Sequence, residues 1–274
     1  MTHEHNADRR SFLKTGAIAG TALVAGAPRA IARDDNDDTD ENRPLPKGDV
    51  AILKFLAVAE ILETDLWEQY NELGGIQDSE VPGGSGNPAY HAKLSVLDGD
   101  MDQYIHDNTE DELTHEQFIN AYLVSKGEKP VDLEPFRTLA GSQATGADKT
   151  KKRLTNLMQL TVDTSWWTRY RSRTRNPDLD PNFAFPQAIP GLFAGQFPAI
   201  PRTDADTTND MHIQAIANTA AFHFAAIEQG GTSLYPTLAQ RVNHPEVLRI
   251  LLSISRPRPC TSRPGRTRRA TLYG

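Results

Sequence analysis

The chain has 274 residues, a formal net charge of −7 and one cysteine, Cys260. A lone cysteine excludes an intramolecular disulfide framework and a thiolate metal cluster, so any metal ligands must be carboxylates and imidazoles. The negative charge argues against nucleic acid as a main partner. A hydrophobic content of 38% is enough for a core in one large domain or two small ones.

The first 32 residues have the three parts of an export signal. The basic sequence Arg9–Lys14 is followed by a mildly apolar run, Thr15–Ala27, and by the small-x-small sequence Ala30-Ile31-Ala32. This order is typical of a secretory signal, and the twin arginine resembles the signal of the Tat pathway. We therefore expect residues 1–32 to be a Tat signal peptide, the Tat export machinery to be a partner, and the protein to be periplasmic or extracellular. An uncleaved anchor or a disordered basic arm is the alternative.

Residues 33–48 are predicted to form an acidic, disordered linker. The stretch Arg33–Asn42 is mostly Asp and Asn and contains no apolar residue, and Pro44 and Pro46 close it. Beyond the signal, no run is long and apolar enough to cross a bilayer, so we expect no stable membrane span after cleavage.

A first helix is predicted over Asp49–Leu73, with Asp49 as its N-cap and Gly74-Gly75 as its end. Glu60 falls in an apolar stripe that recurs at helical spacing through Leu53, Leu56, Trp67 and Tyr70. A carboxylate on an apolar face must be paired, protonated or bound to metal, because burying it bare is costly. Glu63 lies near the edge of the stripe and is a weaker candidate for the same role.

A second helix is predicted over Met101–Lys126, after a flexible Gly-rich loop, Val81–Pro88. Glu112 and His115 lie three residues apart on its apolar face, so both side chains can reach one metal ion. Four-helix carboxylate proteins use this Glu-x-x-His pair twice, with one Glu on each of the other two helices. An acidic chain with eight histidines gives about one such spacing by chance. The alternative for His115 is a core histidine hydrogen-bonded to a neighbouring helix.

A third helical segment is predicted over Lys152–Arg171, with Trp166 and Trp167 packing it onto the other helices. Asp163 is a candidate ligand from this segment, although a structural hydrogen bond is the simpler role. The next stretch, Asn176–Thr208, is rich in Pro, Gly and Phe, and we expect an ordered loop held by its aromatic residues. A loop of this length is usually functional or a covering lid.

The next helix is predicted to begin between Asp206 and Asn209 and to carry Glu228 on its apolar stripe. Glu228 thus repeats the arrangement of Glu60. The stripe consists of Ile213, Ala217, Ala220 and Phe224.

Several residues near the end of this helix have their own predicted roles. His223 lies off the stripe and is expected to be a surface or packing residue. Gly230-Gly231 in mid-helix suggests a close helix approach or a local bulge, and Tyr235-Pro236 is expected to kink or restart the helix. A last helix is predicted to open at Asn243–Glu246 and to continue to Ile254.

The composition changes abruptly at Arg256. Residues 256–274 hold six arginines and no acidic residue, and Pro257, Pro259 and Pro264 prevent a helix from continuing. We therefore predict a folded helical domain over residues 49–255, with its last helix truncated, and a basic, disordered tail over residues 256–274.

Three motifs together resemble one known family. Ala59–Glu63, Glu112-x-x-His115 and Ala226–Tyr235 look like the ferritin-like domain of Tat-exported bacterial proteins of the desiccation-related type, and the similarity spans Asp49–Ile254. The resemblance implies an all-α, ferritin-like four-helix bundle with an extra helix and a long loop in its crossover. It also implies a di-metal site with redox work on oxygen or peroxide, including metal oxidation. Carried over to this chain, the ligands of iron or manganese are Glu60, Glu112, His115 and Glu228.

The chain departs from that family where the last helix should bring a second Glu-x-x-His pair. Codons permitted for Arg256–Arg269, read two nucleotides later, can encode Ala-Glu-Ala-Met-His-Phe-Gln-Thr-Trp-Gln-Asp-Lys-Ala, which contains such a pair. In that frame, Cys260-Thr261 permits only His or Tyr at the histidine position. We interpret the tail as the product of a shifted reading frame, and a genuine basic tail that binds an acidic surface is the alternative.

The form of the tail decides how much metal the chain can hold. With the tail as written, three carboxylates and one histidine remain, which can hold one ion but two only poorly, and metal can then be absent. Two other functions stay open: a non-catalytic structural or stress-protective helical protein, and a binding module that uses the loop Phe183–Pro201. The sequence decides neither whether the protein is an enzyme nor whether it forms a homo-oligomer.

Overall fold

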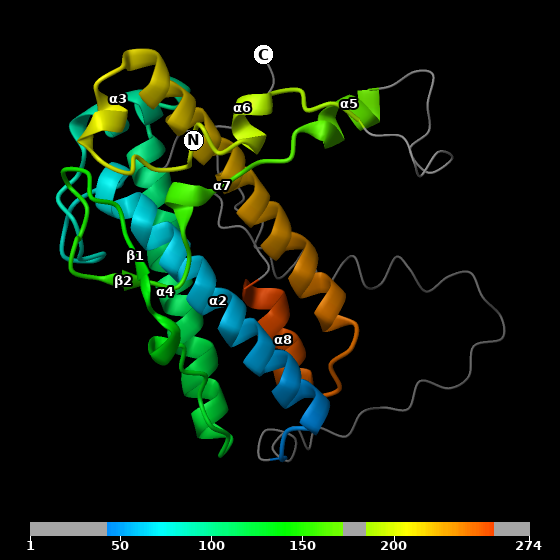
Figure 1. Ribbon diagram of the computed structural model, residues 1–274. Coiled ribbons are helices and arrows are strands. Elements are labelled where there is room, and N and C mark those ends of the chain that lie inside the picture. Colours follow the sequence, from blue (N-terminus) through cyan, green and yellow to red (C-terminus); the bar gives the residue numbers. More distant parts are fainter. Residues whose placement is uncertain (1–42, 172–184, 255–274) are drawn as a thin grey trace, which may run out of the picture. The chain divides into compact units, whose positions relative to one another are not determined.

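Helices dominate the computed structural model, which describes residues 43–171 and 185–254 (Figure 1). The described α-helices are α2 (Lys47–Gly74), α3 (Pro88–Leu97), α4 (Met101–Ser125), α5 (Ser165–Arg171), α6 (Pro190–Phe193), α7 (Asp210–Ala239) and α8 (Pro245–Ile254). The chain is therefore of the predicted all-α class. The predicted signal peptide and basic tail, and most of the predicted linker, lie outside the described residues. Among the helices of the described part, none combines the length and apolar content that crossing a bilayer requires.

The long connection between α4 and α7 contains only short elements. These are β1 (Leu139–Ala140), β2 (Lys152–Arg153), α5, α6 and the 3-10 turns η2 (Glu134–Phe136), η3 (Leu157–Gln159) and η4 (Asp204–Thr207). The two strands pair antiparallel, with Leu139 opposite Arg153.

The predicted helices in the positions of α2, α4, α7 and α8 are all present, with ends close to the expected residues. The linker prediction is wrong at its end, because Lys47 and Gly48 already belong to α2. The helix α3 was not predicted. It begins directly after the loop at Val81–Pro88, where the Asn87 side chain accepts a hydrogen bond from the Tyr90 N–H at 3.0 Å. This is an N-cap that the Asn-Pro sequence could have indicated.

The predicted helix over Lys152–Arg171 is wrong for most of its length, because only α5 is a regular helix. The cause is a long-range contact. The buried Asp65 carboxylate on α2 accepts hydrogen bonds from the backbone N–H groups of Leu154 at 3.0 Å and Thr155 at 2.8 Å. These N–H groups therefore point at α2 instead of along a helix of their own. Trp166 and Trp167 are about half exposed, at 48% and 54%, and neither is part of the buried core.

One cluster of buried residues joins the C-terminal half of α2 to α4 and α7. The Trp67 ring stacks on Phe224 of α7 with ring centroids 5.0 Å apart, and Tyr70 meets Phe224 edge to face at 4.6 Å. The described part of the predicted loop Asn176–Thr208 is ordered and joins this cluster through Ala199 and Ile200. The loop is also held by an aromatic residue, because the Phe197 ring contacts the His212 ring of α7 with centroids 5.5 Å apart.

A second cluster joins the N-terminal half of α2 to α8 and to the end of α4. Val247, Ile250 and Leu251 of α8 pack against Leu53, Leu56 and Ala57 of α2 and against Ile119 and Leu123 of α4. The start of α8 is also tied to α4, because the Tyr122 hydroxyl donates a hydrogen bond to Glu246 at 2.8 Å. The helix α8 is therefore packed against α2 and the end of α4.

Asp49 is not the N-cap of α2, as predicted, but lies in its first turn and caps a different element. Pro46 occupies the N-cap position of α2. The fully buried Asp49 carboxylate accepts hydrogen bonds from the backbone N–H groups of Asn243 at 3.0 Å and His244 at 2.7 Å. These groups lie in the turn that leads into α8. Asp49 therefore fixes the start of α8 beside the start of α2.

The C-terminal part of α7 is a continuous helix, so the predicted restart at Pro236 is wrong. The close approach predicted at Gly230-Gly231 is also wrong, because a Cβ atom at either residue would meet nothing within 4 Å. Side-chain hydroxyls support this part of the helix. Ser233 and Thr237 each donate a hydrogen bond to the carbonyl four residues earlier.

The Asp49 contact gives a prediction for stability. Asp49→Ala should lower the free energy of unfolding by about 2–3 kcal/mol, because two buried N–H groups lose a charged acceptor. Asp49→Asn keeps one acceptor oxygen and should lose less. Urea denaturation measures both, with Asp98→Ala as the control, since Asp98 accepts one similar hydrogen bond in an exposed position. Equal losses for Asp49→Ala and Asp98→Ala would contradict the assigned role.

Candidate metal centre

Three of the four predicted ligands converge between two packed helices. Glu60 on α2 and Glu112 and His115 on α4 each offer a ligand atom, and these atoms lie within 4.8 Å of one another. His115 Nδ1 lies 3.1 Å from Glu112 Oε2 and 3.3 Å from Glu60 Oε2. The spacing of Glu112 and His115 on one helix and the packing of α4 along α2 together produce this group (Figure 1).

The fourth predicted ligand, Glu228, lies at the border of this group. It is not among the residues whose ligand atoms are within 4.8 Å of one another. Burial raises the pKa of Glu228, and the negative charges of Asp111 and Glu60 raise it further. Its Oε1 atom is buried and has no hydrogen-bond partner among the described residues. A buried acceptor without a partner is costly, and a cation would satisfy it.

Glu63, the weaker candidate from the sequence, belongs to the same acidic centre. Burial raises the pKa of Glu63 to about 8, and the nearby charges of Glu60 and Glu228 contribute to the increase. The negative charges of Glu60 on α2 and Glu228 on α7 therefore both act on the Glu63 carboxyl group. It extends the centre from the group of Glu60, Glu112 and His115 towards Glu228.

Tyr235 on α7 is a functional candidate that the sequence analysis missed. Its side chain is buried, and its hydroxyl donates a hydrogen bond to Glu60 Oε1. This contact occupies one carboxylate oxygen and leaves Oε2 of Glu60 beside His115. Tyr235 follows Glu228 by seven residues, so both lie on one face of α7, and this spacing was the available signal.

The centre holds protons that a cation would displace. Burial raises the pKa of Glu112 to about 9, and the charge of Glu60 contributes, although a hydrogen bond with His115 opposes the shift. Burial disfavours the charged forms of His115 and Glu60. The hydrogen bond between them and their hydrogen bonds with Glu112 favour the charged forms, and together they outweigh the effect of burial. The pKa of His115 therefore rises to about 10, and the pKa of Glu60 is lowered. The protonated imidazole of His115 and the protonated carboxyl group of Glu112 thus both lie beside Glu60.

The donor set fits iron or manganese. Carboxylate oxygens and an imidazole nitrogen are the ligands that these ions accept in helical carboxylate proteins. Glu60, Glu112 and His115 would hold an ion directly, and Glu63 and Glu228 are placed to contribute further oxygens.

Asp163 and His223 have structural roles. Asp163 is exposed and accepts hydrogen bonds from the Ser165 N–H at 2.9 Å and the Gln187 side chain at 2.8 Å, which excludes it from the centre. Burial lowers the pKa of His223 to about 4, so its ring is neutral, and its Nδ1 atom shares a hydrogen bond with the Tyr70 hydroxyl at 2.7 Å. Both contacts agree with the structural roles expected from the sequence.

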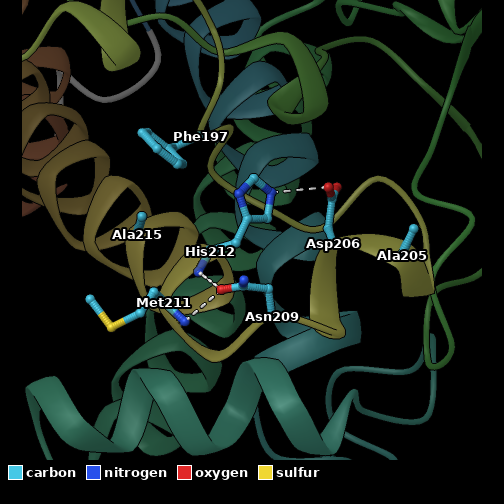
Figure 2. A pocket seen from close by; sticks show the side chains of 7 residues that line it. All are labelled: Phe197, Ala205, Asp206, Asn209, Met211, His212 and Ala215. Carbon is cyan, nitrogen blue, oxygen red and sulfur yellow. Dashed lines mark hydrogen bonds and ion pairs between the residues drawn. The ribbon is translucent and has the colours of Figure 1, made fainter.

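An open pocket of about 620 Å³ lies near the start of α7 (Figure 2). In it, His212 Nε2 lies 3.1 Å from Asp206 Oδ1, and the Phe197 ring lies beside the His212 ring. The Asn209 side chain accepts the first free N–H groups of α7, from Met211 and His212. The pocket is separate from the metal centre, because Met211 and Glu228 are about 25 Å apart along α7.

No family model, curated protein or solved structure matches this chain. The geometry of the described residues therefore carries the assignment of the candidate centre.

Metal binding at this centre should release protons. Glu112 and His115 have pKa values of about 9 and about 10, so at pH 7 both must lose a proton before their ligand atoms bind a cation. Affinity for Mn²⁺ should therefore rise as the pH increases from about 6 to about 9. Calorimetry in two buffers of different ionisation enthalpy measures the proton release.

The variant Glu112→Gln serves as the control, since it cannot contribute its proton and should bind Mn²⁺ more weakly. Equal heats of Mn²⁺ binding in both buffers for the unmodified protein would contradict the protonation state described for the centre.

Proposed function

We propose that this chain is an exported ferritin-like protein that binds iron or manganese at a buried carboxylate and histidine centre. The observation that carries the proposal is the convergence of Glu60, Glu112 and His115 between α2 and α4. The order of the helices supports the ferritin-like assignment. Two long helices pack together, a long connection follows, and α7 and α8 complete the order that the family resemblance implies. Export rests on the sequence of residues 1–32 alone.

Each residue of the centre has a separate role in holding an ion. Glu60 and Glu112 supply buried carboxylates, and His115 supplies a terminal imidazole. Tyr235 holds the orientation of Glu60 through its hydroxyl. Bound iron or manganese would supply one-electron redox chemistry towards oxygen or peroxide. The burial of the carboxylates limits access of water to the ion.

Glu60, Glu112, His115 and Glu228 are four of the six ligands that such a di-metal centre needs, and the direction of α8 suggests where the other two belong. Asp49 holds the start of α8 beside the start of α2, and α8 then packs along Leu53–Ala57. The two helices therefore run in the same direction. At about 1.5 Å per residue, a helix extended one to two turns beyond Ile254 would reach the level of Glu60 and Glu63.

The shifted-frame sequence would place its Glu-x-x-His pair within those two turns. A frame-restored chain would thus bring a second pair to the side of the centre where Glu63 and Glu228 lie. The pair would thus lie at the same height along α2 as the centre, which supports the proposal that the tail as written results from a frame change. Resequencing of the gene and the mass of the C-terminal peptide test it. An unambiguous sequence together with a peptide of the written composition would overturn it.

Metal content tests the proposed function. We expect the frame-restored protein to bind about two ions of iron or manganese per chain and the written chain to bind at most about one, because the written chain lacks the second Glu-x-x-His pair. Elemental analysis of both purified forms measures this. Glu112→Ala should lower the occupancy in each form. Asp163→Ala is the control, because this carboxylate is exposed and outside the centre, and it should leave the occupancy unchanged. Less than about half an ion per chain in both forms would rule out the function.

A further inference from the structure

A second group of metal-ligating side chains lies away from the centre. Asp78 and Glu80, in the loop between α2 and α3, and His106 on α4 offer ligand atoms that lie within 4.8 Å of one another. His106 and Glu112 are about 9 Å apart along α4, and the two groups share no residue. This group therefore needs its own explanation.

His106 is unusual among these residues because its ring is buried while its partners are at the surface. The side chain is 4% exposed, and its Nε2 atom points towards the two acids, at 3.1 Å from Asp78 Oδ1. Its Nδ1 atom is buried and makes no hydrogen bond with the described residues. The Asp107 carboxylate lies 3.8 Å from Nδ1.

This environment is the one that a metal-binding histidine requires. An imidazole that binds a metal through one nitrogen keeps a proton on the other, which usually faces a carboxylate. The Asp107 carboxylate lies on that side of the His106 ring. A simple ion pair between His106 and Asp78 needs neither Asp107 nor Glu80.

The loop that carries the two acids fixes the position of Asp78. The Asp78 carboxylate accepts hydrogen bonds from the backbone N–H groups of Glu80 at 2.9 Å and Val81 at 3.3 Å. Val81 is buried, and the Gln77 side chain donates hydrogen bonds back to the end of α2. In contrast, the Glu80 carboxylate is exposed and makes no hydrogen bond or ion pair with the described residues. Glu80 is therefore available to a ligand and is not needed by the loop.

We infer that Asp78, Glu80 and His106 bind one divalent cation of the zinc class. Two carboxylates and one imidazole give three protein ligands, and water would fill the remaining position. The imidazole favours Zn²⁺ over Ca²⁺ and Mg²⁺, which prefer sites made of oxygen ligands. A bound ion would connect the loop after α2 to the first half of α4. The site is independent of the proposed function, because it uses none of the residues of the first centre.

Calorimetric titration of the full chain with Zn²⁺ alone tests the inference. Glu80→Gln is the informative variant, because it removes one ligand oxygen without removing a contact that the fold uses. It should weaken one class of Zn²⁺ sites by about tenfold or more. Asp100→Asn removes an equal charge from an exposed residue whose side chain makes no capping contact, and it should change the affinity by less than about twofold.

A second comparison separates this site from the first centre. The class of Zn²⁺ sites weakened by Glu80→Gln should persist in Glu112→Gln, which affects only the first centre. Anomalous diffraction at the zinc edge should place an ion beside His106. The inference is overturned if Glu80→Gln and Asp100→Asn bind Zn²⁺ equally well, or if Glu112→Gln abolishes all binding. In the second case the first centre alone binds the metal.

Discussion

Helix α2 buries four carboxylates, and the rest of the described chain is arranged to satisfy them. A buried carboxylate needs a charged partner or hydrogen-bond donors, because its desolvation is costly. The four acids obtain their donors from three parts of the described chain: the turn before α8, the helices α4 and α7, and the connection between α4 and α7. Asp49 binds the turn before α8, and Glu60 binds Tyr235 and contacts His115. Asp65 binds Leu154, Thr155 and Arg137. Glu72 binds the buried Arg153.

Three of these acids have structural partners, and one lies in a group that a cation completes. Asp49 and Asp65 accept several N–H groups, and Glu72 pairs with an arginine. Glu60 instead shares its space with another carboxylate and an imidazole, which must hold protons in order to coexist. The difference between a structural acid and a candidate ligand therefore lies in the partners and not in the burial.

The helical spacing of apolar residues predicted the helices α2, α4, α7 and α8, whose buried faces contact one another. Glu60, Glu112 and His115 could be found because an acid on an apolar stripe is a local signal. The fold of residues 152–164 could not be found in this way. It depends on Asp65, which is about 90 residues away along the chain. Tyr235 was missed because a tyrosine on an apolar stripe also suits ordinary core packing. The group around His106 was missed because two of its members belong to an irregular loop.

The contact between Asp49 and the turn before α8 has a consequence for helical phase. It fixes both the height and the rotation of α8 relative to α2 at Pro245. Any residue inserted within α8 would turn the following side chains by about 100° and raise them by about 1.5 Å, whereas an insertion in the preceding turn could be absorbed there. If α8 continued beyond Ile254, the side chains that it would present to Glu60 and Glu63 would thus be set by a carboxylate about 16 to 21 Å away along α2.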